Sequence, residues 1–358
     1  MTSPALLQVA VGGDRPYSIT IGAGAQADGA ALASHVRGRH VLLLSDSEVA
    51  PRYLASVKQT LLAARPDLII GEHVLAAGEA SKTLAEFGRA IEALAALGAT
   101  RDACVFALGG GVVGDLAGFA AATYQRGIDY VQIPTTLLSC VDSSVGGKTA
   151  VDLKGGKNLA GAFYQPKLVL CDYSTLSTLT DAQFADGMAE VIKYGMIFDR
   201  AFLDFLLENE AKDNLETVIT RCVTLKRDVV EQDEQDNGKR GLLNFGHTLG
   251  HAIEGCSDFS ITHGSAVAVG MVLASRAAYK MNVSKADETK LLCKLLQKYH
   301  LPMQTDYSAE ALTSRALSDK KRAGDRITLI LPEEAGKCVL YPISTDRLLD
   351  FTKQGLNA

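Results

Sequence analysis

The chain has 358 residues, of which 47% are hydrophobic and 22% are charged. This length fits about two domains of roughly 150 residues each, and the composition is ordinary for a globular protein. The formal net charge of −5 argues against a general nucleic-acid-binding protein, which typically carries a basic excess. A small anionic ligand is still compatible with this charge, because it needs only a local cluster of cations.

The seven cysteines are scattered and form no C-x-x-C pair. This pattern is not typical of a disulfide framework or a zinc knuckle, and it favours a reducing compartment. Residues 1–11 have no basic region and too short an apolar run for a signal peptide. No apolar run reaches the roughly 18 residues of a membrane span. We therefore expect a cytoplasmic protein.

The first half alternates short apolar runs with amphipathic segments, which predicts a parallel sheet covered by helices. Pro51 suits a first helical turn, Ser81 can cap a second helix, and Gly98 can end it. The expected strands are Val41–Ser45, Ala103–Leu108 and Tyr130–Ile133, and the expected helices are Pro51–Ala64 and Ser81–Gly98.

After about residue 181, long segments with helical spacing dominate. We therefore expect an α/β N-terminal domain with a Rossmann-like parallel sheet over residues 1–178, and a mainly α-helical C-terminal domain over residues 179–358. The expected helices are Phe184–Phe198, Ala201–Glu208, Leu215–Glu231, Thr248–Glu254, Ala266–Tyr279 and Lys285–Tyr299, with one strand at Ile327–Leu331.

A glycine-rich turn follows the strand that ends near Leu108. Gly109, Gly111 and Gly114 satisfy G-x-G-x-x-G, and such glycines let backbone N–H groups approach a pyrophosphate at a helix N-terminus. The usual acidic residue about twenty positions further on is absent, although an earlier strand ends in Ser45-Asp46-Ser47-Glu48. The turn predicts either a dinucleotide in a non-standard arrangement or only a tight connection between strand and helix.

A second glycine motif, Ser144-Val145-Gly146-Gly147-Lys148-Thr149, resembles the end of a Walker A loop. That motif needs a glycine five residues before its second glycine, and this chain has Asp142 there. The mismatch excludes an ATPase of this type. What remains is a lysine-rich loop that either binds an anion or is simply solvated.

Three of the seven histidines cluster at His247, His251 and His263. His247 and His251 are four apart on an expected helix and therefore share a face. A catalytic divalent metal usually takes about three protein ligands, so two histidines and a carboxylate would suffice. The candidate carboxylate is Glu190, which is three residues from Lys193 in an apolar run. The alternative for Glu190 and Lys193 is an ordinary surface ion pair.

Taken together and in this order, these motifs resemble the 3-dehydroquinate synthase family over about residues 40–340. The matching stretches are Gly109–Asp115, Pro134–Leu138, Val141–Thr149, Ala189–Gly195, Leu243–Thr248, Gly250–Ala252 and His263–Gly264.

The resemblance implies site residues of four kinds. The metal ligands, usually for zinc or cobalt, are Glu190, His247 and His263, and this leaves His251 as an acid–base group or phosphate contact. The catalytic side chains are His251, Lys193, Asp236 and Lys148. The NAD contacts are Asp46, Glu48, Gly78, Glu79, Ala80, Ser81, Lys82, Gly111, Val112, Val113, Gly114, Asp115, Thr135, Thr136, Lys148, Lys157, Thr175, Leu176, Ser177 and Thr178. The substrate contacts are Asp142, Lys148, Lys157, Asn158, Lys193, Lys226, Arg240, Asn244, His251 and Lys320, together with Arg126, which the family lends across a homodimer interface.

Two positions depart from the family pattern. Asp236 stands where the family often has Glu, and Asp186 stands where some members carry an amide.

The reaction that the resemblance implies converts 3-deoxy-D-arabino-heptulosonate 7-phosphate to 3-dehydroquinate and phosphate, a lyase step of the shikimate pathway for aromatic amino acids. NAD transiently oxidises a hydroxyl, phosphate leaves by β-elimination, the hydride returns, and an intramolecular aldol reaction closes the ring. The alternatives are another sugar-phosphate cyclase, a metal-dependent polyol dehydrogenase or a non-catalytic relative. The presence of Arg240, Asn244, His251 and Lys320 favours the dehydroquinate synthase.

Overall fold

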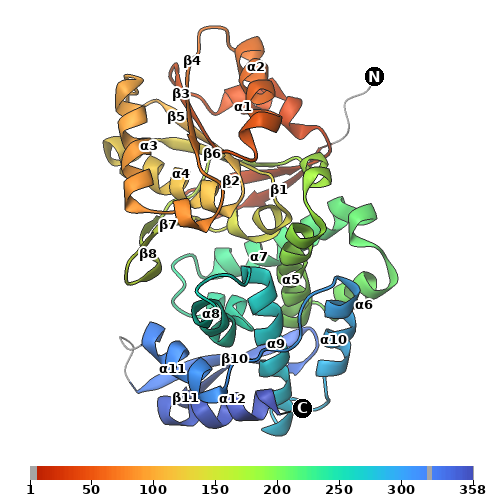
Figure 1. Ribbon diagram of the computed structural model, residues 1–358. Helices are drawn as coiled ribbons and strands as arrows, with labels where there is room; N and C mark the ends of the chain where they lie inside the picture. Colours follow the sequence, from red (N-terminus) through yellow and green to blue (C-terminus); the bar gives the residue numbers. More distant parts are fainter. Residues whose placement is uncertain (1–5, 321–324, 358) are drawn as a thin grey trace. The chain divides into compact units, whose positions relative to one another are not determined.

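The computed structural model describes residues 6–320 and 325–357 (Figure 1). It divides into two compact units. The first unit consists of the residues up to Leu179 together with Lys226–Gln235, and the second consists of Thr180–Leu225 and the residues from Asp236 onward. Lys320 is the last residue of a helix, but its side chain lies outside the described residues.

A sheet of seven described strands forms the centre of the first unit, in the order β1-β2-β9-β6-β5-β3-β4. All neighbouring strands pair in parallel except β1 and β2, which are antiparallel. The expected parallel α/β sheet is therefore confirmed. The strands are β1 (Leu7–Val11), β2 (Tyr17–Ile21), β3 (His40–Asp46), β4 (Ile69–Leu75), β5 (Cys104–Gly109), β6 (Asp129–Pro134) and β9 (Leu168–Cys171).

Helices cover both faces of this sheet, which explains why β5, β6 and β9 are buried throughout and why β5 and β9 are apolar. Helices α1 (Gly29–Ser34) and α2 (Ala55–Ala64) lie on one face of the sheet, and α3 (Leu84–Ala96) and α4 (Gly111–Thr123) lie on the other (Figure 1). Leu43 and Phe106 pack in the core under α1 and α2, and the adjacent residues Leu42 and Val105 pack in the core under α3 and α4. This alternation follows from the two-residue period of a strand.

Two helix starts differ from the prediction. Thr83, not Ser81, caps α3, because its side chain accepts a hydrogen bond from the Glu86 N–H. Ser81 instead donates its hydroxyl to the carbonyl of Ala76. Pro51 lies in a π-helical turn, Ala50–Leu54, that precedes α2. The predicted end of α3 is confirmed, since Gly98 follows it with a φ of 72°.

The stretch after the second glycine motif forms a hairpin that the sequence patterns did not predict. Strands β7 (Lys148–Leu153) and β8 (Gly156–Phe163) pair in antiparallel register, with Lys148 opposite Phe163. The hairpin belongs to the first unit.

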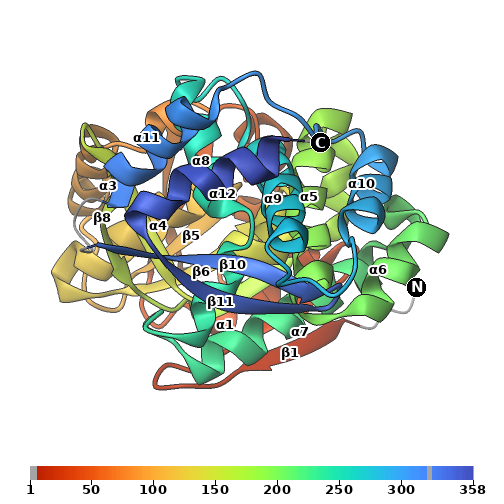
Figure 2. The same cartoon turned by 90° about the horizontal axis from the view of Figure 1, so that it is seen from below.

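The second unit is mainly helical, as expected, and contains one antiparallel hairpin. Helix α7 (Leu215–Gln232) begins in this unit and ends in the first. Figure 2 shows α12 beside α9. The other elements are α5 (Asp181–Phe198), α6 (Arg200–Glu208), α8 (His247–Cys256), α9 (His263–Lys280), α10 (Thr289–Lys298), α11 (Ala309–Lys320), α12 (Leu348–Leu356), β10 (Arg326–Glu334) and β11 (Lys337–Ser344).

Glycines allow α8 and α9 to approach closely. A Cβ atom on Gly270 would lie 2.0 Å from the carbonyl oxygen of Gly246, and one on Gly250 would lie 3.2 Å from that of Ala266. Gly246 precedes α8 with a φ of 79°. This packing fixes the start of α8 against α9. Among the described residues, no helix combines the length and apolar character needed to cross a membrane.

Candidate functional site

The candidate NAD contacts of the first unit lie at one edge of its sheet. Parallel strands have their carboxyl ends at the same edge, and each predicted contact group follows such an end. Asp46 ends β3, the glycine-rich turn follows β5, and Thr135 and Thr136 follow β6. The group Gly78–Lys82 follows β4, and Thr175–Thr178 follows β9 as part of a 3₁₀ helix.

The strand order places a topological switch point between β3 and β5. These two strands are neighbours, but the chain continues from β3 to β4 on one side and from β5 to β6 on the other. In open α/β sheets, ligands bind outside the carboxyl ends of the strands at such a point. Asp46 and the glycine-rich turn therefore flank the position where a dinucleotide is expected. The Asp46 carboxylate also accepts hydrogen bonds from the N–H groups of Glu48 and Val49, which fixes the following turn.

The glycines of this turn are required by their surroundings. A Cβ atom on Gly109 would lie 2.6 Å from the Val113 side chain, and one on Gly114 would lie 2.8 Å from Gln132. Gly110 caps α4 without a side-chain hydrogen bond, so the first backbone N–H groups of the helix are available for an anion. A Cβ atom on Gly111 would lie 3.0 Å from the Ser143 hydroxyl.

Two buried hydroxyls near this turn support the same interpretation. The Oγ atoms of Thr135 and Ser143 are buried and have no hydrogen-bond partner among the described residues. Buried polar groups are normally satisfied, so orphaned hydroxyls beside an open helix N-terminus fit a polar ligand such as the nucleotide.

An ion network links the β4 loop to α4. The Nζ of Lys82 lies 2.6 Å from Asp115 and 3.7 Å from Glu79, and Lys157 lies 3.8 Å from the same Glu79 oxygen. Burial alone would lower the pKa of Lys82, but Asp115 and Glu79 outweigh it and raise that pKa. Burial raises the pKa of Asp115, and Lys82 partly offsets this. The network thus brings four of the predicted contacts together.

The cofactor candidates Thr175–Thr178 lie in the 3₁₀ helix that follows β9. The hydroxyl of Tyr53 lies 3.0 Å from the Thr178 hydroxyl, and Thr178 donates to the carbonyl of Thr175. Thr175 and Leu176 are buried, whereas Ser177 donates to the carbonyl of Ser174. These contacts anchor the 3₁₀ helix.

The candidate substrate contacts of the first unit include the ion pair of Asp142 with Lys226, and Lys148, which follows a glycine turn. Lys148 begins β7 after Gly146 and Gly147, which have φ values of 93° and 67° that favour glycine. The Tyr17 hydroxyl accepts the Gly146 N–H and thereby holds this turn.

Asn158 and Arg126 also lie in the first unit. Asn158 has a φ of 56°, and its N–H donates to Asp152. Arg126 is exposed and shortly precedes β6, so it lies at the opposite edge of the sheet from the candidate NAD contacts. Within the first unit, the structure does not bring Arg126 together with the candidate NAD contacts.

In the second unit, the three expected metal ligands come together. Glu190 lies on α5, His247 is the first residue of α8, and His263 is the first residue of α9. One donor atom from each lies within 4.8 Å of the others. The Nε2 atoms of His247 and His263 lie 3.5 Å and 3.2 Å from the same Glu190 oxygen. A buried carboxylate and two imidazoles are a donor set that suits zinc or cobalt.

The surroundings orient both imidazoles and set their pKa values. The Nδ1 of His247 lies 3.1 Å from the carbonyl oxygen of Phe245, which turns Nε2 toward Glu190. Burial, with Lys193 second, holds the pKa of His247 well below its usual range. For His263, burial would lower the pKa, but Glu190 and Glu254 raise it to about 10. The negative charge around His263 favours a cation at this position.

Lys193 and His251 border this cluster. Lys193 is 1% exposed and pairs with Glu190, which is 0% exposed, so the alternative of a surface ion pair is wrong. The predicted shared face of His247 and His251 is confirmed, with ring centroids 5.3 Å apart. His251 is exposed, which suits a group that contacts a substrate.

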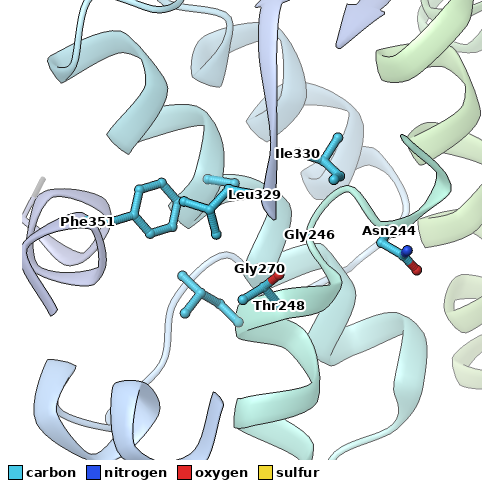
Figure 3. A pocket seen from close by; sticks show the side chains of 9 residues that line it. Asn244, Gly246, Thr248, Gly270, Leu329, Ile330 and Phe351 are labelled. Atoms are coloured by element: carbon cyan, nitrogen blue, oxygen red, sulfur yellow. The ribbon is translucent and has the colours of Figure 1, made fainter. Parts of the chain in front are cut away.

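Three further candidates lie just before α8. Arg240 is almost fully buried, Asn244 ends the 3₁₀ helix Lys239–Asn244, and Asp236 has a φ of 57°. Figure 3 shows a small cavity here, in which Phe351 and Leu329 face each other while the amide of Asn244 points away from them. This cavity is mainly apolar.

One residue at this cluster, Glu254, was missed by the sequence motifs. The Oε2 of Glu254 lies 3.6 Å from Nδ1 of His263, on the side of the ring away from Glu190. Glu254 is 2% exposed. Its sequence signal is a lone acid in the run Ala252-Ile253-Glu254, three residues after His251 on the same helix.

Comparisons with known proteins agree with this geometry. The family model for the N-terminal part of 3-dehydroquinate synthase matches residues 72–186, and the model for the C-terminal part matches residues 187–322. A 3-dehydroquinate synthase from Xanthomonas oryzae pv. oryzae is 54% identical over 348 residues, which cover 93% of this chain and 94% of the relative.

Two solved structures are similar over nearly their whole length. A 2-deoxy-scyllo-inosose synthase, in complex with carbaglucose-6-phosphate, NAD⁺ and Co²⁺, has a TM-score of 0.87 and 29% identity, covering 98% of this chain and 100% of that one. A 2-epi-5-epi-valiolone synthase from Streptomyces hygroscopicus subsp. jinggangensis 5008, with NAD⁺ and Zn²⁺ bound, has a TM-score of 0.86 and 26% identity, covering 98% and 99%. The family models, the 54% identity and the fold together show that this chain belongs to the 3-dehydroquinate synthase family.

Proposed function

We propose that this chain uses Glu190, His247 and His263 to hold a divalent metal for the 3-dehydroquinate synthase reaction. That lyase reaction converts 3-deoxy-D-arabino-heptulosonate 7-phosphate to 3-dehydroquinate and phosphate in the shikimate pathway. The observation that carries the proposal is the convergence of these three donors in a buried cluster. The Zn²⁺ and Co²⁺ bound by the two similar structures support it. A bound divalent ion would supply Lewis acidity to an oxygen of the substrate.

The proposal assigns nucleotide binding to residues 1–178. Asp46, the open N-terminus of α4 and the orphaned Thr135 hydroxyl lie at the sheet edge where nucleotides bind in α/β folds. NAD would supply a hydride acceptor that is regenerated within each turnover. The Lys82–Asp115 pair lies beside this position and orients the loop that follows β4.

Residues 179–358 are assigned the metal and many of the substrate contacts. Phosphate carries about −1.5 to −2 charges near neutral pH, so it requires cations. Lys193 and Arg240 are buried in this unit, and Lys148, Lys157 and Lys226 belong to the first unit. Burial keeps such cations poorly hydrated and therefore strong partners for an anion.

Proton transfer is assigned to the exposed imidazole of His251. His251 lies one helical turn after His247 on α8, with its ring 6.1 Å from that of His263. A ring nitrogen of His251 would take or give a proton at the substrate, while Lys193 orients the carboxylate of Glu190. Asp236 would take the place of the glutamate that is common in the family.

We also propose a cytoplasmic homodimer. All seven cysteines are free thiols, which suits a reducing compartment. Arg126 is exposed at the edge of the sheet opposite the candidate NAD contacts of its own unit, which fits a contribution to the site of a partner subunit. Sedimentation of the purified chain tests the dimer.

The experiment that tests the function is a phosphate-release assay with the heptulosonate phosphate, run with and without NAD. Release that requires NAD and yields 3-dehydroquinate supports the proposal. If the substrate is inert while another sugar phosphate is cyclised, the chain is a different cyclase. If NADH accumulates without phosphate release, it is a polyol dehydrogenase.

A further inference from the structure

Helix α8 presents three titratable side chains on one face. His247, His251 and Glu254 are spaced at i, i+4 and i+7, which places them along a single stripe of an α-helix. Glu254 is 2% exposed although it is a carboxylate. Burying a carboxylate is costly unless it is paired, so its neighbours identify what it does.

One neighbour of this buried carboxylate is His263. The Nδ1 of His263 lies 3.6 Å from Oε2 of Glu254, and its Nε2 lies 3.2 Å from Oε1 of Glu190. The ring is therefore held between two carboxylates, with one nitrogen facing each. His247 has the same arrangement, because its Nδ1 faces the Phe245 carbonyl and its Nε2 faces Glu190. In both histidines, Nδ1 faces an oxygen atom and Nε2 points into the cluster.

We propose that Glu254 is a positioning residue that holds His263 ready for the metal. Once a metal has displaced the proton from Nε2, the carboxylate of Glu254 would hold the remaining ring proton on Nδ1, so that the lone pair of Nε2 stays directed at the position shared with Glu190 and His247. This inference rests on the proposed metal site. Carboxylates behind metal-binding histidines fix the ring and make it a more basic ligand.

The cluster contains a competing arrangement. His251, Glu254 and His263 also have donor atoms within 4.8 Å of one another, which could describe a second metal position. Both positions would use His263, so filling both would strip both ring protons from one imidazole. The positioning role needs only the proton that a neutral imidazole carries, and the geometry therefore points to it.

Zinc binding to the full-length apo chain, measured by competition with a chromophoric chelator, tests the inference. Glu254→Gln keeps the size of the side chain and removes its charge. We expect zinc affinity to fall about ten- to hundred-fold, whereas Glu254→Asp retains the charge and loses less. The matched control is Glu86→Gln, because Glu86 is also buried, at 8% exposure, and pairs with a histidine, His73, in the other unit. The control should bind zinc like the parent chain.

The outcomes separate this inference from the proposed function. If the parent chain binds no zinc, the proposed metal site itself is overturned. A parent chain that binds one equivalent, with a folded Glu254→Gln chain of unchanged affinity, overturns only the role of Glu254. Binding of two equivalents, with one lost in Glu254→Gln, establishes the second metal position instead.

A readout in the unaltered protein covers the case in which Glu254→Gln does not fold. Nitrogen-15 NMR of the zinc-loaded parent chain distinguishes the two imidazole nitrogens. A proton on Nδ1 of His263 and zinc on Nε2 support the inference, and the reverse assignment overturns it.

Discussion

Lys226 forms an ion pair with Asp142, although 84 positions separate the two residues in the chain. Both were expected to contact the substrate. The pair also ties the segment Lys226–Gln235 to the rest of the first unit. Two further contacts act alongside it: Gln165 donates to Glu234 at 2.9 Å, and the Gly12 N–H donates to Glu231 at 2.6 Å. A candidate substrate contact therefore has a structural role as well.

The stability of the protein should depend on this pair. We expect Lys226→Met and Asp142→Asn to be coupled by about 0.5–3 kcal/mol in a double-mutant cycle, because both side chains are largely removed from water. Urea unfolding of the two single variants and the double variant measures this coupling. The exposed pair Lys212 and Asp181 is the control and should show no measurable coupling. Equal behaviour of the two pairs would contradict the structural role.

The parts of the fold that follow from local chemistry were predictable. Apolar runs identified β3, β5 and β6, and helical spacing identified α5 to α10, because each must bury a face or stripe. The β7–β8 hairpin escaped prediction because its outward side chains alternate with small residues and carry no strong pattern. The assignment of Lys226–Gln235 to the first unit could not be read from the helical spacing of α7, which does not change at Lys226.

The grouping of Glu190 with His247 and His263 was expected only through the family resemblance. Spacing alone favoured His247 and His251 as a ligand pair, since both lie on α8. In the structure, Glu190 groups instead with His247 and His263, and this depends on the crossing of α5, α8 and α9. Tertiary contacts of that kind leave no periodic trace in the sequence.

Metal removal should affect both stability and activity. We expect a chelator to abolish phosphate release and zinc or cobalt to restore it, because Glu190, His247 and His263 would lose their common cation. Zinc should raise the melting temperature of the apo chain but not that of His263→Ala, since ligand binding stabilises the folded state. His300→Ala, at an exposed position outside the cluster, serves as the control. Full metal content in His263→Ala would refute the assignment.

The close approach of α8 and α9 gives a second stability prediction. Gly270→Ala should destabilise the chain by about 1–3 kcal/mol, because the new Cβ would lie 2.0 Å from the Gly246 carbonyl oxygen. Gly88→Ala is the matched control, since a Cβ atom on this residue of α3 meets nothing within 4 Å. It should instead stabilise by about 0.5–1 kcal/mol. Denaturant midpoints for both variants test this, and equal shifts would disprove the packing argument.

The last prediction concerns the role of NAD. Because the hydride is returned in each cycle, an amount of NAD far smaller than the amount of substrate should support complete conversion of the substrate. Phosphate and product should appear in equal amounts, with no steady rise in absorbance from NADH. Lys193→Ala, which removes the partner of Glu190, should slow turnover. Continuous NADH formation in the parent enzyme would show that the chain is a dehydrogenase.

The path of the chain through its two units has a consequence for biosynthesis. The polypeptide passes from one unit to the other after Leu179, returns within α7 after Leu225, and leaves again after Gln235. A nascent chain that stops at residue 179 has every strand of the large sheet but lacks Lys226, Glu231 and Glu234, which bind Asp142, Gly12 and Gln165. The first unit therefore cannot finish folding on the ribosome until a stretch of the second has emerged. Cutting the gene at residue 179 should yield an N-terminal fragment that is less resistant to proteolysis than the same unit in the whole protein.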